Sequence, residues 1–282
     1  MLKKNSDSAK GYGSSYGRSY SAYGGSGDMF AVQEAYKAIR TNIILSVVKD
    51  GCKKLVVTSS VPHEGKTTTA LNLAISLAQA FKKVLLIDGD LRKSKIHRAF
   101  GISPDPGLTN VISGLADIKD AIQATKYQNL YCITSGITAP NPAEMLAGER
   151  MQAIVEGLEE HFDYIIFDTP PVNVVSDALP LIKMSDGVIL IVRAGVTVYT
   201  DFEAALSSLE FIGAHIVGVI VNGDDGSDEG TYGQYGKYGK YGRYGRYGKN
   251  SKFGEKYDVN SSYGGYAGTA SAKNGTEEAE KK

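Results

Sequence analysis

Short runs of aliphatic and β-branched residues recur along the middle of the chain, between longer segments of mixed polarity. Six such runs stand out, with the sequences KLVVTSS (54–60), KVLLIDGD (83–90), NLYCITS (129–135), DYIIFDTP (163–170), GVILIVRA (187–194) and HIVGVIVN (215–222). Their Val, Ile and Leu residues follow one another almost without polar alternation, which is typical of strands covered on both faces. The pattern therefore predicts the strands of a mostly parallel sheet.

Segments between these runs have apolar residues at helical spacing, at 67–81, 149–160 and 200–212. A further amphipathic segment, at 30–48, precedes the first strand. Strands that alternate with helices predict a doubly wound α/β fold. Because right-handed crossovers bring the carboxyl ends of parallel strands to one edge, a ligand is expected at that edge.

Composition separates both ends of the 282-residue chain from its middle. Residues 1–27 and 223–282 are rich in Gly, Ser, Tyr and Lys and contain few Leu, Ile, Val or Phe. Such segments bury too little apolar surface to offset the conformational entropy of ordering them. We therefore expect one folded domain at 28–222 between two disordered tails.

Charge and the length of apolar runs exclude several functions. The formal net charge is zero, which argues against a general nucleic-acid-binding or membrane-seeking protein. No apolar run approaches the ~18–20 residues needed to cross a bilayer, and the start MLKKNSDSAK lacks an apolar signal core. Cys52 and Cys132 fit no metal-binding spacing and are expected to be buried in a reducing compartment. The sequence predicts a cytoplasmic protein that reaches a membrane only through a partner.

A glycine and a lysine open the helix that follows the first strand, in the run SSVPHEGKTTT at 59–69. Such a turn points backbone amides at a bound phosphate, and glycine permits a close approach. Lys66 would reach the β- and γ-phosphates, and Thr67 would offer its hydroxyl to Mg²⁺. Ser60 stands where the Walker A pattern has its first glycine, so a chance match is the alternative. The residues expected to contact the nucleotide here are Ser60, Glu64, Gly65, Lys66, Thr67 and Thr68.

Acidic residues end two of the predicted strands. Asp88 and Asp90 lie in VLLIDGDLR, and Asp168 lies in YIIFDTPP. All three are expected at the same edge as Lys66, where carboxylates repel one another unless a cation lies between them. Each aspartate alone is explained equally well as the cap of the following turn. Three of them beside a phosphate loop favour a magnesium site.

Residues 30–222 resemble the bacterial protein-tyrosine kinases associated with capsular and extracellular polysaccharide synthesis. SSVPHEGKTTT is similar to their Walker A motif, LLIDGDLR to Walker A′ and IIFDTPP to Walker B, and a terminal tyrosine cluster completes the pattern. The resemblance implies a P-loop NTPase fold of the deviant Walker A superfamily. Partition-type ATPases of that superfamily are the main competitors. Their signature lysine would stand five residues before Lys66, where this chain has Val61.

The resemblance implies ATP and Mg²⁺ as cofactors and assigns roles to the site residues. Lys66, Asp88 and Asp90 are the implied catalytic residues, with Asp88 taking or orienting the tyrosyl proton. The implied magnesium ligands are Thr67, Asp88, Asp90 and Asp168. Asn222 is implied near the adenine, although an asparagine there would equally serve to end a strand.

Partners follow from the same resemblance. Glu34, Lys37 and Arg40 form a line on the segment at 30–48 and correspond to a family motif that guides assembly of a homo-oligomeric ring. Lys37 replaces an arginine of that motif and lacks the bidentate fork, and a solvated helix face is the simpler interpretation. The family works with a membrane-protein activator of the polysaccharide co-polymerase type. No such segment is fused here, so we expect an activator in trans and an opposing tyrosine phosphatase.

Tyrosines concentrate outside the predicted domain. Four of the 18 lie in the first tail, and nine lie in the second. The nine are the expected phosphoacceptors: Tyr232, Tyr235, Tyr238, Tyr241, Tyr244, Tyr247, Tyr257, Tyr263 and Tyr266. The run from Tyr232 to Lys249 carries five cations and no acid. Phosphorylating its six tyrosines would add about −9 to −12 of charge, which is expected to repel the tail from an acidic strand edge and to dissociate the ring.

The sequence thus favours an ATP-dependent tyrosine kinase that autophosphorylates its C-terminal cluster and regulates polysaccharide synthesis or export. One alternative is a partition-type ATPase that switches assembly without phosphorylating protein. Another is a structural role in which the Tyr-Gly repeats drive self-association.

Overall fold

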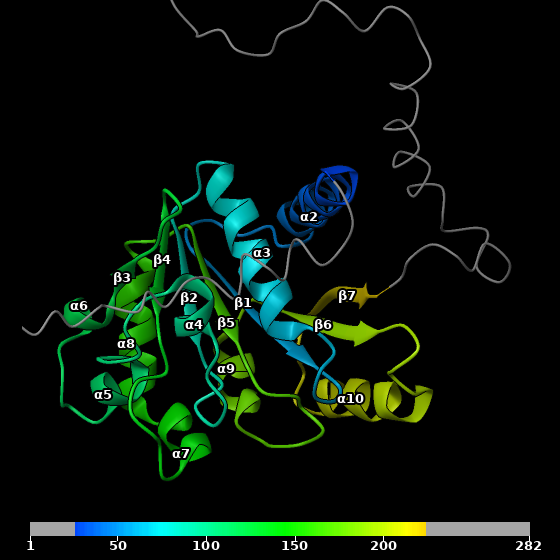
Figure 1. Ribbon diagram of the computed structural model, residues 1–282. Helices are drawn as coiled ribbons and strands as arrows, with labels where there is room; N and C mark the ends of the chain where they lie inside the picture. The colour runs from blue at the N-terminus through cyan, green and yellow to red at the C-terminus, as the bar shows by residue number, and fades with distance from the viewer. Residues whose placement is uncertain (1–25, 224–282) are drawn as a thin grey trace, which may run out of the picture. The chain divides into compact units, whose positions relative to one another are not determined.

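The computed structural model describes residues 26–223, with side chains from Phe30 onward. Its centre is a seven-stranded sheet in the order β3-β4-β2-β5-β1-β6-β7 (Figure 1). All neighbouring strands are parallel except the pair β3 and β4. The strands are β1 (Lys53–Ser59), β2 (Val84–Asp88), β3 (Gln123–Ala124), β4 (Leu130–Ile133), β5 (Tyr164–Asp168), β6 (Gly187–Arg193) and β7 (Ile216–Asn222).

Helices cover both faces of this sheet, as Figure 1 shows. They are α2 (Ser26–Ser46), α3 (Lys66–Gln79), α4 (Ile96–Phe100), α5 (Leu108–Ile112), α6 (Ile118–Ala121), α7 (Pro142–Ala147), α8 (Glu149–Glu159), α9 (Ala178–Met184) and α10 (Tyr199–Phe211). The apolar sides of α2 and α3 share one core with the sheet, and those of α8, α9 and α10 share another. The predicted doubly wound α/β fold is confirmed.

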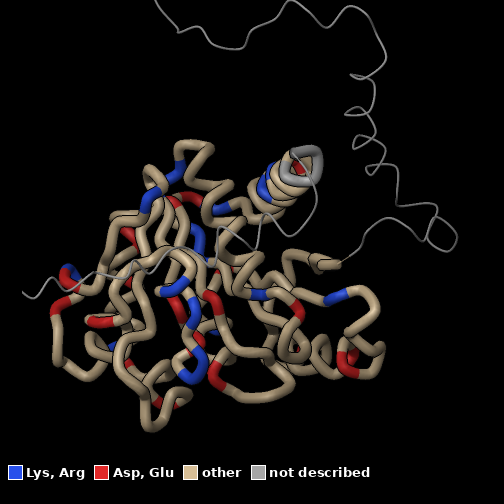
Figure 2. The backbone as a smooth tube through the Cα atoms, in the orientation of Figure 1, with Lys and Arg blue, Asp and Glu red and all other residues tan. Residues whose placement is uncertain are grey.

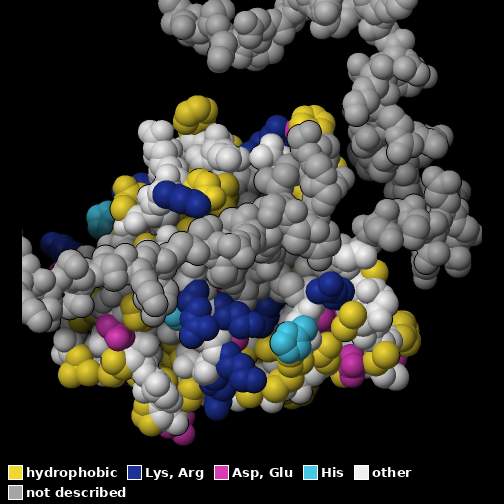
Figure 3. All heavy atoms as spheres, in the orientation of Figure 1, with side chains coloured by type: hydrophobic (Ala, Val, Ile, Leu, Met, Phe, Trp, Pro, Cys, Tyr) yellow, Lys and Arg dark blue, Asp and Glu magenta, His cyan; other side chains and the backbone are white. Residues whose placement is uncertain are grey.

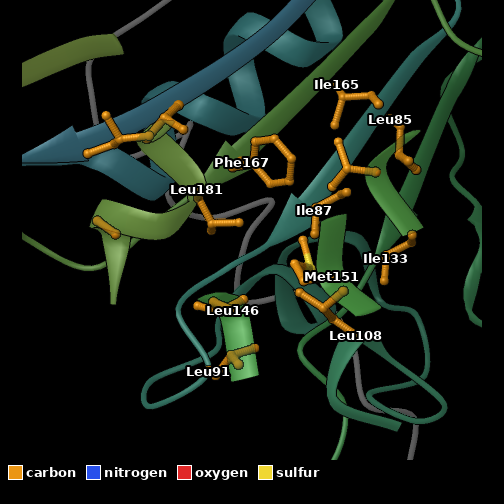
Figure 4. Packing of buried hydrophobic residues seen from close by; sticks show 14 of the residues in the cluster. Leu85, Ile87, Leu91, Leu108, Ile133, Leu146, Met151, Ile165, Phe167 and Leu181 are labelled. Atoms are coloured by element: carbon orange, nitrogen blue, oxygen red, sulfur yellow. The ribbon is translucent and has the colours of Figure 1, made fainter. Parts of the chain in front are cut away.

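Strand β2 illustrates why its apolar run has no polar alternation. Leu86 faces the core formed with α3, whereas Leu85 and Ile87 face the core formed with α8 and α9. In Figure 4, Ile87 lies near Met151 of α8 in that second core. Because successive strand side chains point to opposite faces, a strand covered on both faces needs apolar residues at every position.

The six predicted strands are present, and their carboxyl ends share one edge. Helix α2 begins at Ser26, four residues before its predicted start at Phe30. The short strand β3 and the short helices between β2 and α8 were not predicted, because segments of two to six residues show no measurable period. Of the two predicted tails, only Ser26, Gly27 and Gly223 belong to the described range. The prediction of disorder for residues 1–25 and 224–282 concerns residues outside that range. Within that range no helix is both long and apolar enough to span a bilayer.

Candidate nucleotide site

The loop between β1 and α3 lies at the centre of the sheet edge, and its glycine is required there for two reasons. Gly65 has φ +96°, a left-handed backbone that residues with a side chain rarely adopt. A Cβ atom at Gly65 would also lie 2.6 Å from Nδ2 of Asn222. Helix α3 starts immediately afterwards at Lys66, so its free amides point at the space in front of the loop.

The side chain of Glu64 is turned into the protein and holds the loop in shape. It is fully buried. Its Oε2 accepts a hydrogen bond from the amide of Val61 at 2.9 Å, and its Oε1 accepts one from the hydroxyl of Thr197. A carboxylate beside bound phosphates would repel them. The side chain of Glu64 is therefore not available for the predicted nucleotide contact, which stays a prediction for its backbone.

Asn222, the last residue of β7, contacts the back of the same loop. Its Nδ2 donates to the carbonyl oxygen of Glu64 at 2.9 Å and to Oγ1 of Thr69 at 3.1 Å. Its own carbonyl oxygen accepts from the amide of Ala194 at 2.9 Å. The residue does more than end a strand, because it joins β7 to the phosphate loop and to the first turn of α3.

Lys66 is held at the mouth of the loop by an acidic neighbour. Its Nζ lies 3.1 Å from Oδ2 of Asp90, and both side chains are largely buried. Burial lowers the pKa of Lys66, but the carboxylates of Asp168, Asp90 and Asp88 outweigh burial and raise it. The lysine is therefore positively charged at neutral pH. The amide of Lys93 donates to the other oxygen of Asp90 at 3.0 Å, which fixes this carboxylate.

Asp88 ties together the loop that follows β2. Its Oδ2 accepts hydrogen bonds from the hydroxyl of Ser94 at 2.7 Å and from the amide of Ile96 at 3.3 Å, and its Oδ1 accepts from the amide of Asp90 at 3.2 Å. Asp88 is fully buried, and this burial raises its pKa to about 6. Its contacts match the capping interpretation of the sequence, so as a general base it remains a prediction.

Asp168 differs from the other two aspartates because one of its oxygens is unused. The side chain is 1% exposed, and its Oδ1 has no hydrogen-bond partner. Burial raises the pKa of Asp168 to about 7, while the charge of Lys66 and a hydrogen bond with Thr67 oppose that shift. A buried, unpartnered carboxylate oxygen beside a lysine and a hydroxyl is a suitable ligand for a hard cation.

Two further features of the loop bear on ligand binding. The hydroxyl of Ser60, at the position of the missing first glycine, is buried and has no hydrogen-bond partner. Thr68, one of the predicted nucleotide contacts, is exposed on the first turn of α3. Among the described residues, only three buried side-chain polar atoms lack a partner, and two of them belong to Ser60 and Asp168. The unsatisfied groups thus concentrate where a ligand was predicted.

A charged pair at the edge of the site was missed from the sequence. The guanidinium of Arg92 binds Asp177 through two hydrogen bonds, Nε to Oδ2 at 2.6 Å and Nη2 to Oδ1 at 3.1 Å. Asp177 is 1% exposed and directly precedes α9, whereas the Arg92 side chain is 48% exposed. The pair joins residues 85 positions apart, so no local signal could reveal it. The LR ending of the Walker A′ run was the available hint.

The predicted oligomer line on α2 divides into two parts. Lys37 pairs with Glu34 at 2.6 Å on the exposed face. Arg40 instead donates from Nη1 to the carbonyl oxygen of Ser76 in α3 at 2.6 Å. Arg40 therefore docks α2 on its own domain, while Glu34 and Lys37 remain at the surface. The nine predicted phosphoacceptor tyrosines lie outside the described residues.

A phosphate loop after a central parallel strand, with aspartates ending the neighbouring strands, defines a P-loop nucleotide-binding domain, and a model of the AAA domain family matches residues 61–212. Over 190 residues the chain is 40% identical to the tyrosine-protein kinase YwqD of Bacillus subtilis. The aligned region covers 67% of this chain and 80% of YwqD. The chain therefore belongs to the family of bacterial protein-tyrosine kinases.

Solved structures agree with this assignment. The kinase domain of the Escherichia coli tyrosine kinase ETK superposes with a TM-score of 0.65 at 34% identity, covering 68% of this chain and 75% of that domain. The septum site-determining protein MinD of Pyrococcus horikoshii, complexed with Mg-ADP, gives a TM-score of 0.54 at 25% identity, covering 63% and 72%. The fold is thus shared with the septum site-determining protein MinD, whereas the family is that of the tyrosine kinases.

Proposed function

We propose that this protein transfers the γ-phosphoryl group of ATP to tyrosines of its own C-terminal segment. The observation that carries the proposal is the 3.1 Å contact between Lys66 and Asp90 in front of the loop amides. This contact keeps a charged ammonium group where phosphates would lie. Phosphoryl transfer depends mainly on positioning and on charge stabilisation, which backbone amides and a fixed lysine supply.

Magnesium is the proposed second cofactor, and the residues fit it. Within residues 26–223, no three His, Cys, Asp or Glu side chains are close enough to hold a metal ion by themselves. Asp168, with its unpartnered Oδ1, and Thr67 would hold the ion directly or through water, together with nucleotide oxygens. Asp88 and Asp90 would complete its surroundings. When bound, Mg²⁺ neutralises charge on the phosphate oxygens.

Proton transfer from tyrosine is assigned to Asp88, as the family resemblance implies. Its carboxylate is buried, and the hydroxyl of Ser94 fixes its orientation. A phenol has a pKa of about 10, so an anionic acceptor nearby assists the reaction. The loose transition state of phosphoryl transfer requires little early deprotonation. Asp88→Asn should therefore lower the rate while Lys66→Ala abolishes it.

The proposed acceptors are the tyrosines at 232–266, and the exit point of the chain supports this choice. Strand β7 ends at Asn222, which contacts the phosphate loop. The C-terminal segment consequently leaves the fold beside the nucleotide site. Mixing the wild-type protein with Lys66→Ala distinguishes whether a tail serves its own site or that of another subunit. Phosphotyrosine on the inactive variant means that a tail is modified in the site of another subunit.

The biological role proposed is regulation of capsular or extracellular polysaccharide synthesis or export. The proposed assembly is a homo-oligomeric ring at the cytoplasmic face of a membrane, held there by a membrane-protein activator in trans. A tyrosine phosphatase would reverse the modification. These assignments rest on family membership alone.

Incubation with ATP and Mg²⁺, followed by mass-spectrometric mapping of phosphotyrosine, tests the proposed reaction. The wild-type protein should acquire phosphate on tyrosines at 232–266, and Lys66→Ala should acquire none. The matched control is Lys82→Ala, which removes an exposed lysine from the opposite end of the sheet. Hydrolysis of ATP without phosphotyrosine would instead identify a partition-type assembly switch.

A further inference from the structure

Four exposed cations follow β2 at the mouth of the nucleotide site. We call this set the basic rim, and it consists of Arg92, Lys93, Lys95 and Arg98. No Asp or Glu occurs between Leu91 and Pro104. Figure 2 shows Lys and Arg along the segment from β2 to α4, and Figure 3 shows such side chains gathered on the same face. The exposed charge at this edge is therefore positive, whereas the sequence, with its three aspartates, had predicted an acidic edge.

Burial explains why the acidic residues nearby do not cancel the rim. Asp88, Asp90 and Asp168 are at most 7% exposed, and Lys66 already neutralises part of their charge. Asp177 is likewise buried and is occupied by Arg92. That pair also fixes the Arg92 guanidinium while leaving about half of the side chain exposed. The surface of the rim therefore presents cations to solvent without exposed acidic neighbours in its own segment.

We propose that the basic rim binds the phosphorylated tyrosine run at 232–247 of the C-terminal segment, an inference that rests on the proposed function. Each phosphotyrosine carries about −1.5 to −2 of charge and three strong acceptor oxygens, for which arginine forks and lysines are matched ligands. The unmodified run has five cations and no acid between Tyr232 and Lys249. Phosphorylation therefore reverses the charge of the run, and the rim should bind the phosphorylated run more tightly than the unmodified one.

The topology brings the run within reach of the rim. Four strand-to-strand steps separate β7 from β2, which corresponds to about 19 Å across the sheet. The ten residues from Gly223 to Tyr232 extend to about 33 Å. A chain that leaves Asn222 and crosses toward β2 passes over the ends of β6, β1 and β5, and hence over the phosphate loop and Asp168.

Retention of product at the rim has a consequence for the order of reaction. Tyrosines in the run are three residues apart, which is about 10 Å in an extended chain. A phosphotyrosine held at the rim keeps its unmodified neighbours close to the site. One modification therefore accelerates the next on the same segment, and the cluster fills processively.

Peptide binding to the full-length Lys66→Ala protein tests this proposal without requiring kinase activity. A fluorescent peptide of residues 231–249, phosphorylated on two or more tyrosines, should bind at least about tenfold more tightly than its unphosphorylated form. Lys93→Glu with Lys95→Glu should weaken the phosphopeptide by about tenfold. Lys82→Glu with Lys119→Glu makes the same charge change at exposed sites elsewhere and should bind as the parent does. Circular dichroism melts confirm that both variants fold.

Three outcomes would overturn the proposal. They are equal affinity for the two peptides, equal weakening by the rim and control substitutions, and capture of the protein by phosphatidylglycerol vesicles in place of the peptide. A protein that forms phosphotyrosine but fails to bind the phosphopeptide would refute the rim alone. Peptide binding without phosphotyrosine formation would refute the proposed function alone.

Discussion

The side-chain nitrogen Nδ2 of Asn222 lies 2.9 Å from the carbonyl oxygen of Glu64, so the end of the last strand holds the phosphate loop from behind. The same nitrogen lies 3.1 Å from the hydroxyl of Thr69. A single side chain thereby positions both the loop and the first turn of α3. Neither partner is a neighbour in sequence, since 158 residues separate Asn222 from Glu64.

Replacing Asn222 by alanine should weaken nucleotide binding. The substitution leaves the Glu64 carbonyl oxygen without this donor, and losing such a bond costs about 1 kcal/mol or slightly more. We expect a fluorescent ATP analogue to bind about five- to tenfold more weakly. Asn173→Ala is the control, because Asn173 also donates to a backbone carbonyl but lies on the exposed surface. Unchanged nucleotide affinity of Asn222→Ala would contradict the assigned role.

Gly65→Ala should lose measurable nucleotide binding. The new methyl group would meet Asn222 at 2.6 Å, and φ +96° would be strained as well. Gly51→Ala separates the two effects, because Gly51 has φ +74° but open space around it. Its cost is therefore backbone strain alone, about 1–2 kcal/mol of stability, with nucleotide binding retained. Isothermal titration calorimetry and thermal melts distinguish the two variants.

Asp168→Asn should stabilise the nucleotide-free protein in a pH-dependent way. Burial raises the pKa of Asp168 in the folded state from its ordinary 3.8 to about 7. The protonated side chain is favoured in the folded state, so this contribution to stability is fully present below pH 4. It is lost progressively as the pH rises from about 4 to 7, because the buried group must then ionise. The variant should match the wild type below pH 4 and exceed it above pH 7 by up to about 4 kcal/mol, the energy equivalent of moving the pKa from 3.8 to about 7.

Thermal melts across this pH range check that prediction. Asp50→Asn changes an exposed carboxyl group and should leave the pH profile as it is in the wild type. A constant difference between Asp168→Asn and the wild type at every pH would show that ionisation of Asp168 is not the cause. In the presence of ATP and Mg²⁺ the sign should reverse, because the variant removes a proposed ligand of the ion.

Arg40→Ala and Lys37→Ala should separate domain stability from ring assembly. Arg40 donates to Ser76 of α3, so its loss should lower the melting temperature by about 2–4 °C per kcal/mol removed. Lys37 makes an exposed pair with Glu34, which contributes little to stability. If the exposed face of α2 contacts a neighbouring subunit, Lys37→Ala lowers the oligomer mass in native mass spectrometry without lowering the melting temperature. A full-size oligomer of Lys37→Ala would exclude that side chain from the interface.

Sequence reasoning located the parts of the site that are local in the chain. A strand, a glycine and a lysine in succession predict the loop at Lys66, and acidic residues after apolar runs predict Asp88 and Asp168 at the same edge. The structure agrees because parallel strands share one edge whatever their order. Helix ends moved by a few residues, since terminal turns carry little pattern.

The contacts that hold the site could not be predicted in the same way. Glu64 pairs with Thr197, 133 residues away, and Arg92 pairs with Asp177, 85 residues away. Such pairs depend on strand order and loop paths that no single sequence encodes locally. The surface charge of the edge was also hidden, because a sequence shows three aspartates without showing that they are buried and that cations surround them.

Asn222 is both the last residue of β7 and a direct contact of the phosphate loop, so no further residue separates the end of the fold from that loop. A force applied to the chain beyond β7, from a docked neighbour or a bound protein, acts first on the residue that braces the Glu64 carbonyl and Thr69. A displacement at this exit point would therefore reach the phosphate loop through the side-chain amide of Asn222.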